Sequence, residues 1–458
     1  MSADWNICTL NEIVDFGNGK ARPKTEGNIP IYGGNGVLGY SDESNYQDET
    51  IIIGRVGAYC GATYYENNPI WISDNALSAK AKEGYLSKYA YYVLKSKNLN
   101  QYAQGSSHPL LTQGLLKTIE AHVTTNLDVQ KKIVSIISGL EDKIELNRQT
   151  NQTLEHIAQA IFKCWFVDFE PTRAKIIAKE KGENSAIQEL AAQAIICGAI
   201  TLERLEAITQ NLETTLQQAI NEKLSQANQT PINTEQLKTT AALFPNELVD
   251  SELGEIPEGW EVQTIDNVTS NIIDHRGKTP KKLGGDWVDK GYPAISAKNV
   301  KGGRLVRHET IRFLSDELYS KWMKVEIEKG DILLTSEAPM GEMYFITDEI
   351  KYCLSQRLYG LRADNKNVTP AFLYLWLQTS IAQADLEGRA TGTTVVGIRQ
   401  VELKKVSVLI PSFEIVKIIE SIVFSLYEKI NANDSESKEL SDLRETLLPK
   451  LLSGDLTI

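Results

Sequence analysis

Two long stretches of the chain carry apolar residues at alternating steps of three and four positions. The first runs from Ile133 to Trp165, and the second runs from Ile419 to Leu451. This spacing places the apolar side chains along one stripe of an α-helix and is typical of a coiled-coil seam. We therefore predict a long helix in each stretch.

The two seams have equal length, and asparagine interrupts both at the same step, at Asn147 and at Asn433. A buried amide that faces an apolar side chain loses its hydrogen bonds, so matched asparagines favour one register. The pattern predicts that the two helices pair with each other. The alternative is that each amphipathic helix packs only on its own domain.

The helices belong to a tandem repeat. Residues 127–147 align without gaps on residues 413–433, at an offset of 286, and eight of these 21 positions are identical. A looser match upstream pairs Trp5 with Trp260, and residues 51–55 with residues 332–336. Each copy therefore consists of a variable globular part followed by one long helix.

The globular parts combine strand and helix patterns, which predicts an α+β fold with an α/β domain in each copy. Short apolar runs after turn residues predict strands, and longer amphipathic runs predict helices. The expected elements are strands at 49–54 and 330–334, returning strands at 58–65 and 340–347, and helices at 86–97 and 370–384.

Residues 173–250 have no counterpart in the second copy. Ser185 and Gln188 have the spacing of a capping box, so a helix is expected to start there, with helical sequence to about residue 227. Residues 229–250 are expected to form a polar connector. The expected segments are therefore 1–126, 127–172, 173–250, 251–412 and 413–458.

Composition excludes several classes of protein. The 458 residues are 42% hydrophobic and 24% charged, which is typical of globular proteins. No apolar run approaches the about 18 residues that span a membrane, and no signal segment opens the chain, so a cytoplasmic location without membrane contact is expected. The five cysteines are too scattered to predict a disulfide framework or a zinc site.

A search for catalytic motifs fails. Gly277-Lys278-Thr279 resembles the end of a phosphate-binding loop, but Ile272 stands where that motif needs glycine. The five histidines lack metal-ligand or catalytic-triad spacing. We therefore expect no catalytic residue, no metal and no cofactor in this chain.

Basic residues are concentrated locally although the net charge is −12. The segment from Arg276 to Arg312 holds ten Lys and Arg residues and three Asp and Glu residues. A polyanion responds to such a local field over a Debye length of about 8 Å. A solvated lysine-rich surface is the alternative to a nucleic-acid contact.

The candidate DNA contacts fall into three groups. Flexible cations suit phosphates, whereas planar donors suit base edges in the major groove. Basic residues on a loop after the first strand of each copy, or nearby in the basic segment, are Lys20, Arg22, Lys24, Arg276, Lys278, Lys281, Lys282 and Lys298. Candidate base readers are Arg55, Arg304, Arg307 and Arg357. Two polar loops at equivalent places, 105–109 and 388–394, add Ser107, His108 and Thr393.

Several motifs together resemble the specificity subunit of type I restriction-modification enzymes. They are Gly259-Trp260-Glu-Val at the start of a copy, a glycine-bearing loop before Leu-Lys-x-Val, the helix motif Lys132-Ile-x-x-Ile-x-x-x-Leu-x-x-Lys-Ile144, and Phe162-x-x-Trp-Phe-Val-Asp-Phe-Glu170. The resemblance covers essentially the whole chain. It implies two target recognition domains in a pseudo-two-fold tandem repeat, separated by an antiparallel coiled coil.

The resemblance also implies partners. Each domain would grip half of a bipartite site in double-stranded DNA. Two modification subunits would bind S-adenosylmethionine and methylate adenine at N6, and restriction subunits would use ATP and Mg to translocate and cleave DNA. A self-contained methyltransferase or nuclease, or a free-standing bipartite DNA-binding protein, is the alternative.

Overall fold

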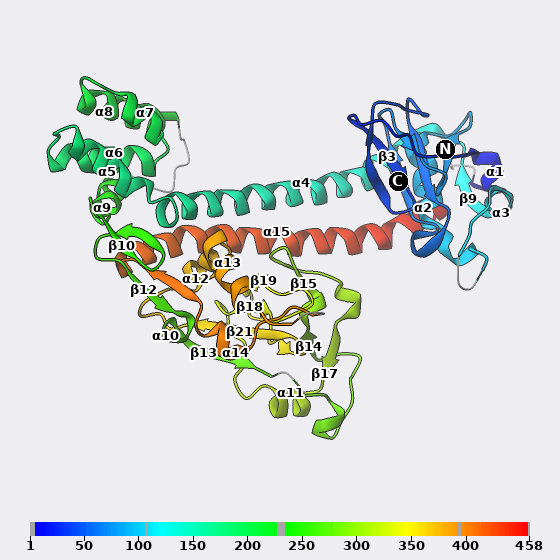
Figure 1. The fold of residues 1–458 in the computed structure, drawn as a ribbon. Coiled ribbons are helices and arrows are strands. Elements are labelled where there is room, and N and C mark those ends of the chain that lie inside the picture. The colour runs from blue at the N-terminus through cyan, green and yellow to red at the C-terminus, as the bar shows by residue number, and fades with distance from the viewer. Residues whose placement is uncertain (1–4, 106–108, 227–233, 276, 393–394, 457–458) are drawn as a thin grey trace. The chain divides into compact units, whose positions relative to one another are not determined.

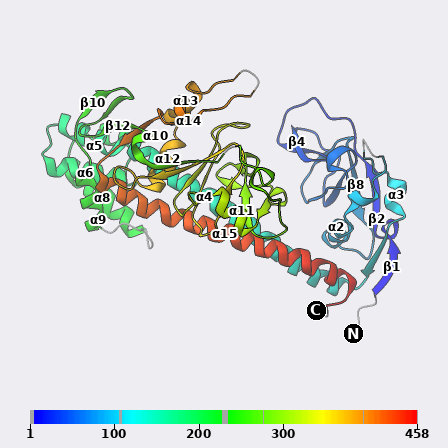
Figure 2. The same cartoon turned by 90° about the horizontal axis from the view of Figure 1, so that it is seen from below.

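Two long antiparallel helices are the most extended elements of the chain. In the computed structural model, which describes residues 5–105, 109–226, 234–275, 277–392 and 395–456, they are α4 (Leu127–Phe166) and α15 (Phe413–Ser453). They lie side by side in two views (Figures 1 and 2). The prediction of a long helix in each seam is confirmed.

The chain divides into two units. Unit 1 comprises Met1–Gln149 and Asn433–Ile458, and unit 2 comprises Thr150–Ala432. Each unit therefore contains part of both long helices. In unit 1, Asn147 Nδ2 lies 3.3 Å from the carbonyl oxygen of Asn433, and in unit 2, Asn151 Nδ2 lies 3.2 Å from that of Ile430. From Asn147 to Asn151 the contacted residue on α15 changes from Asn433 back to Ile430, so the two helices run in opposite directions. The predicted pairing of the helices is confirmed.

Both units contain the same arrangement of strands. In unit 1 the sheets have the orders β1-β9, β2-β8-β5-β6 and β4-β3-β7, and in unit 2 they have the orders β12-β22, β13-β21-β18-β19 and β17-β14-β20. The one parallel pairing in each set, β3 with β7 or β14 with β20, also recurs. The described strands therefore confirm the tandem repeat at the level of topology.

The strand bounds are as follows. Unit 1 has β1 (Trp5–Thr9), β2 (Val14–Asn18), β3 (Ile29–Gly33), β4 (Gly36–Ser41), β5 (Thr50–Gly54), β6 (Thr63–Glu66), β7 (Trp71–Ile72), β8 (Ala76–Ala81) and β9 (Glu120–Thr124). Unit 2 has β12 (Glu261–Thr264), β13 (Thr269–Asp274), β14 (Tyr292–Ile295), β17 (Arg312–Leu314), β18 (Ile332–Thr335), β19 (Met343–Phe345), β20 (Cys353–Leu354), β21 (Leu358–Ala363) and β22 (Ser407–Ile410). Unit 2 adds the hairpins β10 (Leu248–Ser251) with β11 (Gly254–Pro257), and β15 (Val300–Lys301) with β16 (Arg304–Leu305).

Short helices complete the two domains. They are α1 (Leu10–Ile13), α2 (Ser87–Ser96) and α3 (Gln113–Lys117) in unit 1, and α10 (Ile265–Val268), α11 (Asp316–Trp322), α12 (Pro370–Leu377), α13 (Ser380–Gly388) and α14 (Gln400–Leu403) in unit 2. The 3-10 turns are η1 (Gly57–Tyr59), η2 (Leu99–Tyr102), η3 (Lys281–Leu283), η4 (Ala297–Asn299) and η5 (His308–Thr310).

Most elements expected in the globular parts are present, with two corrections. The returning strands expected at 58–65 and 340–347 start later, at Thr63 and Met343, because η1 and a turn precede the first and bend residues precede the second. The helix expected at 370–384 is two helices, α12 and α13. The break occurs because the hydroxyl of Thr379 accepts a hydrogen bond from the amide of Ala382 at 3.3 Å, which caps a new helix.

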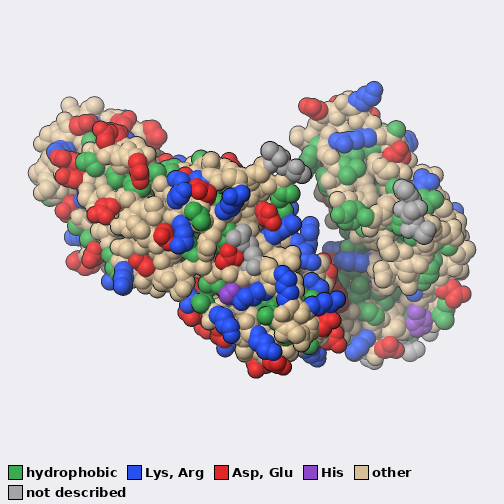
Figure 3. Space-filling model, turned by 60° about the horizontal axis from the view of Figure 1, so that its bottom comes forward, with side chains coloured by type: hydrophobic (Ala, Val, Ile, Leu, Met, Phe, Trp, Pro, Cys, Tyr) green, Lys and Arg blue, Asp and Glu red, His purple; other side chains and the backbone are tan. Residues whose placement is uncertain are grey.

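The insert is a separate helical cluster within unit 2. It contains α5 (Glu170–Glu180), α6 (Ser185–Ile196), α7 (Leu202–Ala207), α8 (Leu212–Gln226) and α9 (Thr234–Ala242), packed around their own apolar core. Acidic side chains are frequent on this part, at the left of Figure 3.

Two expectations for the insert were wrong. The cap of α6 is Asn184, whose side-chain oxygen accepts from the amides of Ala186 and Ile187, so Ser185 is already inside the helix. The segment 229–250 is not simply a connector, since it includes α9 and β10. The ammonium of Lys175 donates to the carbonyl of Phe244 at 2.6 Å and holds this segment against α5.

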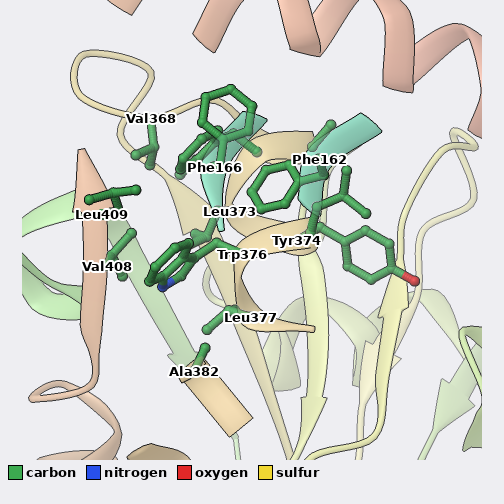
Figure 4. Packing of buried hydrophobic residues seen from close by; sticks show 14 of the residues in the cluster. Phe162, Phe166, Val368, Leu373, Tyr374, Trp376, Leu377, Ala382, Val408 and Leu409 are labelled. Atoms are coloured by element: carbon green, nitrogen blue, oxygen red, sulfur yellow. The ribbon is translucent and has the colours of Figure 1, made fainter. Parts of the chain in front are cut away.

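The hydrophobic core of each unit includes residues from the C-terminal end of the long helix of the other repeat copy. Phe162 and Phe166 of α4 pack on Phe372 of α12, with ring centroids 5.2 and 5.0 Å apart, in the core of unit 2. Figure 4 shows these two side chains above the residues of α12. In unit 1, Leu448 and Leu451 of α15 pack with the globular part of the first copy.

We expect Leu451→Ala to destabilise the N-terminal domain although the change lies near the C-terminus. Leu451 is 2% exposed in the unit 1 core, so its truncation should cost about 2–5 kcal/mol. Hydrogen exchange should then become faster in β1 and β9 and stay unchanged in β18 and β21. Leu443→Ala is the control, because Leu443 is 44% exposed. Equal protection of β1 in the two variants would contradict this closure of unit 1.

Candidate nucleic-acid interface

Unit 2 has a cleft of about 680 Å³ whose charged lining residues are mostly cationic. Its positively charged side chains are Lys278, Lys281, Lys298, Arg312 and Arg357, and the carboxylate of Asp286 also lines it. In Figure 3 Lys and Arg side chains gather on the part of unit 2 that Figure 1 draws lowest, around α11 and β17. The cleft brings together four of the residues that the sequence predicted as DNA contacts.

The parallel pairing of β14 with β20 builds one wall of the cleft. Parallel strands end at the same edge of a sheet, and the residues that follow them, Ser296 and Ser355, both line the cleft. The amide of Ser355 donates to the carbonyl of Ile295 at 2.8 Å and ties the two strand ends together. The turn Ser355–Arg357 is thereby fixed at the cleft.

Arg357 is held at the end of this turn. Its backbone has φ of 65°, the left-handed region, and its carbonyl accepts from the amide of Ser336 at 2.9 Å. Its Nε lies 2.9 Å from the carboxylate of Glu337. The Arg357 side chain is about half exposed. The carboxylate orients its guanidinium, and the group has further donors besides Nε.

Arg312 is a further candidate for a contact with a base edge. The sequence pattern did not identify it as a base reader. Its guanidinium carbon lies 4.1 Å from the ring centroid of Trp287, a cation–π contact that holds the planar group against the aromatic face. Sequence reasoning placed Arg312 only at the end of the basic segment. A tryptophan within that segment was the available signal, but the pairing depends on the fold of β17 against the loop after η3.

The other predicted cations of unit 2 have more local roles. The ammonium of Lys278 donates to the carbonyl of Trp322 at 2.5 Å, and burial, followed by the charge of Lys324, lowers the pKa of Lys278. The ammonium of Lys282 donates to the carbonyl of Gly277 at 2.8 Å. Each lysine therefore uses one of its three donors within the domain. Lys278 ties its loop to the end of α11, and Lys282 bonds within its own loop.

Arg304 and Arg307 do not line the cleft. Arg304 forms an ion pair of 2.9 Å with Glu155 of α4, and both side chains are largely buried. Arg307 is exposed, and its carbonyl accepts from Asn299 Nδ2 at 3.3 Å. A base-reading role for these two arginines stays a prediction.

In unit 1 the basic loop lies next to the equivalent strand ends. Lys20, Arg22 and Lys24 are exposed after β2, and the amide of Lys20 donates to the carbonyl of Ile72 in β7 at 2.9 Å. Arg55 follows β5, and its amide donates to the carbonyl of Asn75 at 3.0 Å. These cations therefore share one edge of the unit.

Three buried polar atoms near that edge lack a hydrogen-bond partner among the described residues. They are Nε of Arg55, Nε1 of Trp71 and Oγ of Ser73. A buried polar atom without a partner is costly, and a ligand or ordered water that supplies the partner removes this cost. This edge of unit 1 is therefore a second candidate contact surface.

Four predicted site residues, Ser107, His108, Arg276 and Thr393, lie outside the described residues. The stems of their loops can be compared. Gln104 and Leu110 exchange two backbone hydrogen bonds, as do Thr391 and Gly397. The two polar loops thus begin and end at equivalent places in the two units.

Among the described residues no group of His, Cys, Asp and Glu is arranged to hold a metal ion. None of the helices in the described ranges has the length and apolar character needed to cross a membrane.

A family model described as "Type I restriction modification DNA specificity domain" matches residues 2–156 and again residues 257–441. These two matches cover most of the chain and coincide with the two repeat copies. The chain belongs to the type I restriction-modification specificity subunits. It is therefore a non-catalytic subunit with a role in DNA recognition, and its two domains are target recognition domains in tandem.

Known specificity subunits are similar over most of their length. The chain is 30% identical over 383 residues to the HindI specificity subunit of Haemophilus influenzae, covering 81% of this chain and 78% of that one. It is 24% identical over 396 residues to the MjaIX specificity subunit of Methanocaldococcus jannaschii, covering 85% and 74%. The crystal structure of the S subunit from M. genitalium matches 98% of this chain and 96% of that one, with a TM-score of 0.55 and 16% identity, which supports the fold.

Reversing the charge of Lys281 and Lys298 should weaken DNA binding by this specificity subunit and reduce its salt dependence. Both lysines are exposed at the cleft. Each lost phosphate contact removes about 0.9 from the slope of log affinity against log salt, so Lys281→Glu with Lys298→Glu should lower the slope by about 1.8. Fluorescence anisotropy over a salt series measures it.

The control variant is Lys366→Glu, since Lys366 is exposed outside the cleft lining. An equal slope for the double variant and the unaltered chain would show that these lysines do not contact phosphates.

Proposed function

We propose that this specificity subunit recognises a bipartite site in double-stranded DNA, with one target recognition domain on each half. The observation that carries the proposal is the repetition of one strand arrangement with basic residues at the same edge. Lys20, Arg22 and Lys24 follow β2 in unit 1, and Lys278, Lys281 and Lys282 follow the equivalent β13 in unit 2. Lysines would neutralise phosphates, and the arginines near them would contact base edges.

The subunit would direct chemistry that partner subunits carry out. We assign adenine-N6 methylation to two modification subunits that bind S-adenosylmethionine, and translocation and cleavage to restriction subunits that use ATP and Mg²⁺. Because the DNA substrate is in the cytoplasm, the assembly would act there. The net charge of −12 is compatible with this proposal if the modification subunits complete the DNA-binding channel.

Two equivalent apolar residues support a pair of identical partners. Ile157 on α4 is 43% exposed, and Leu443, its counterpart at the repeat offset on α15, is 44% exposed. An exposed aliphatic side chain alone carries little information. However, an exposed aliphatic residue at the same position of both repeat copies is what two copies of one partner would require. We infer that each residue contacts one modification subunit.

Reconstitution tests the proposed function. The purified specificity subunit alone should neither methylate nor cut DNA, and addition of the modification subunits should give S-adenosylmethionine-dependent methylation of adenine within one sequence motif. Transfer of a radioactive methyl group to defined DNA fragments measures the reaction. Methylation or cleavage by the isolated chain would overturn the proposal.

Asp substitutions at the two exposed positions should change the stoichiometry of the complex. Ile157→Asp or Leu443→Asp should each remove one modification subunit, and the double variant should remove both, because a charge in an apolar contact is poorly solvated. Native mass spectrometry counts the subunits. Gln152→Asp is the control, since Gln152 is exposed and polar. Retention of two subunits by the double variant would place the contact elsewhere.

The paired helices would set the distance between the two half-sites. The seam from Ile133 to Trp165 spans 33 residues, about 50 Å at 1.5 Å per residue, or roughly 14 base pairs at about 3.4 Å each. Asn151 donates to the carbonyl of Ile430, so heptads inserted after Asn151 and after Lys429 would face each other. All other helix contacts would keep their partners.

This paired insertion should lengthen the unread spacer of the recognition site by about three base pairs, since seven residues rise about 10.5 Å. Methylation should also become slower, because three base pairs rotate one half-site by about 100° relative to the other. Methylome sequencing of cells that carry the variant reads the spacer directly. An active variant with the original spacer would contradict this role of the helices.

A further inference from the structure

Two guanidinium groups of the unit 2 cleft are held in fixed orientations. The guanidinium carbon of Arg312 lies over the ring of Trp287 at 4.1 Å from its centroid, and Arg357 is paired with Glu337 at 2.9 Å. Both arginines line the cleft together with the exposed side chain of Gln356, which precedes Arg357 in the turn after β20. A planar group that is already oriented loses less conformational entropy when it forms two parallel hydrogen bonds.

The surroundings favour a base edge over a phosphate as the ligand of these arginines. The carboxylate of Glu337 contacts Arg357, and that of Asp286 lines the same cleft. A negative charge beside the arginine disfavours a phosphate but tolerates a neutral base edge. Exposed Lys281 and Lys298 are flexible and better suited to the backbone.

Guanine is the base that matches a fixed guanidinium. In the major groove it presents two acceptors, O6 and N7, which a guanidinium contacts with two donors, whereas adenine presents one acceptor beside a donor. Thus two oriented arginines in one cleft match guanine, and an amide such as that of Gln356 matches adenine.

The equivalent turn of unit 1 carries different chemistry. The amide of Ser336 donates to the carbonyl of Arg357, and the amide of Arg55 donates in the same way to the carbonyl of Asn75. These bonds make Asn75 the counterpart of Arg357, and Asp74 the counterpart of Gln356. The carboxylate of Asp74 and the amide of Asn75 cannot replace a guanidinium, so the two domains differ in chemistry at this turn.

We propose that Arg312 and Arg357 are specificity-determining residues that contact guanine O6 and N7 in the half-site bound by unit 2. This inference rests on the proposed function, and it adds the base that this domain selects. It also implies that the half-site bound by unit 1 is not read by an arginine at the corresponding turn.

The test uses the complex of this chain with its modification subunits and the motif found by methylome sequencing. Each guanine of the motif is replaced in turn by 7-deazaguanine, which lacks the N7 acceptor, and affinity is measured by anisotropy. At one or more guanines of a single half-site the loss should be about 10- to 150-fold, the range for one lost hydrogen bond from a charged donor.

Arg312→Lys and Arg357→Lys keep the charge and remove the planar pair of donors. Each should weaken binding to the normal motif and should lose less affinity than the unaltered protein when 7-deazaguanine stands at its own guanine. The salt dependence should stay unchanged, because the charge is kept. Arg399→Lys is the control, since Arg399 is exposed and does not line the cleft. Thermal melting of each variant confirms that it is folded.

The outcomes separate the two claims. Two results would overturn guanine reading and leave the proposed function standing. One is that both lysine variants bind the normal motif with unchanged affinity. The other is that 7-deazaguanine lowers the affinity of the variants as much as that of the unaltered protein. A uniform loss on all sequences with a shallower salt slope would assign the arginines to phosphates and also overturn it. A complex that methylates no defined motif would overturn both.

Discussion

The antiparallel contact between α4 and α15 is the constraint on which both units depend. The equivalent asparagines of the two copies, Asn147 and Asn433, meet there, and the side chain of Asn147 donates to the Asn433 carbonyl and to Glu436. A shift of one helix by a residue would remove these bonds from buried amides. It would also move Phe162 and Phe166 out of the core of unit 2, and Leu448 and Leu451 out of that of unit 1.

The same packing brings the two ends of the chain into contact in unit 1. The last turn of α15 reaches the first strand of unit 1, where Gly454 lies so close to Trp5 that a side-chain carbon at Gly454 would be 2.5 Å from the indole nitrogen. In unit 2, Phe166 at the end of α4 lies against Trp260 with ring centroids 5.8 Å apart, and Phe169, three residues after the helix, meets Trp260 edge-on at 5.8 Å. The tryptophan that opens each copy is thus covered by the helix of the other copy. The strands and helices that build the two domains are repeated, whereas the side chains at their exposed edges have diverged.

Periodicity predicted the long helices and their pairing, because a buried helix face recurs every three to four residues. Internal alignment predicted the repeat, and short apolar runs after turn residues predicted most strands. These patterns failed where one local hydrogen bond decides the outcome. Asn184 rather than Ser185 caps α6, and Thr379 divides the expected helix at 370–384. The site was harder to predict. Lys281, Lys298 and Arg357 line the cleft, but Arg304 forms an ion pair with Glu155, and the stack of Arg312 on Trp287 requires a tertiary contact that no spacing reveals.

The central claim is that each unit contains part of both long helices but reads DNA through its own globular domain. Exchange of residues 1–126 for the corresponding domain of another family member tests it most directly, with the recognised motif determined by methylome sequencing. The account predicts a new sequence in one half-site, with the other half-site and the spacer unchanged. A change in both half-sites would contradict it.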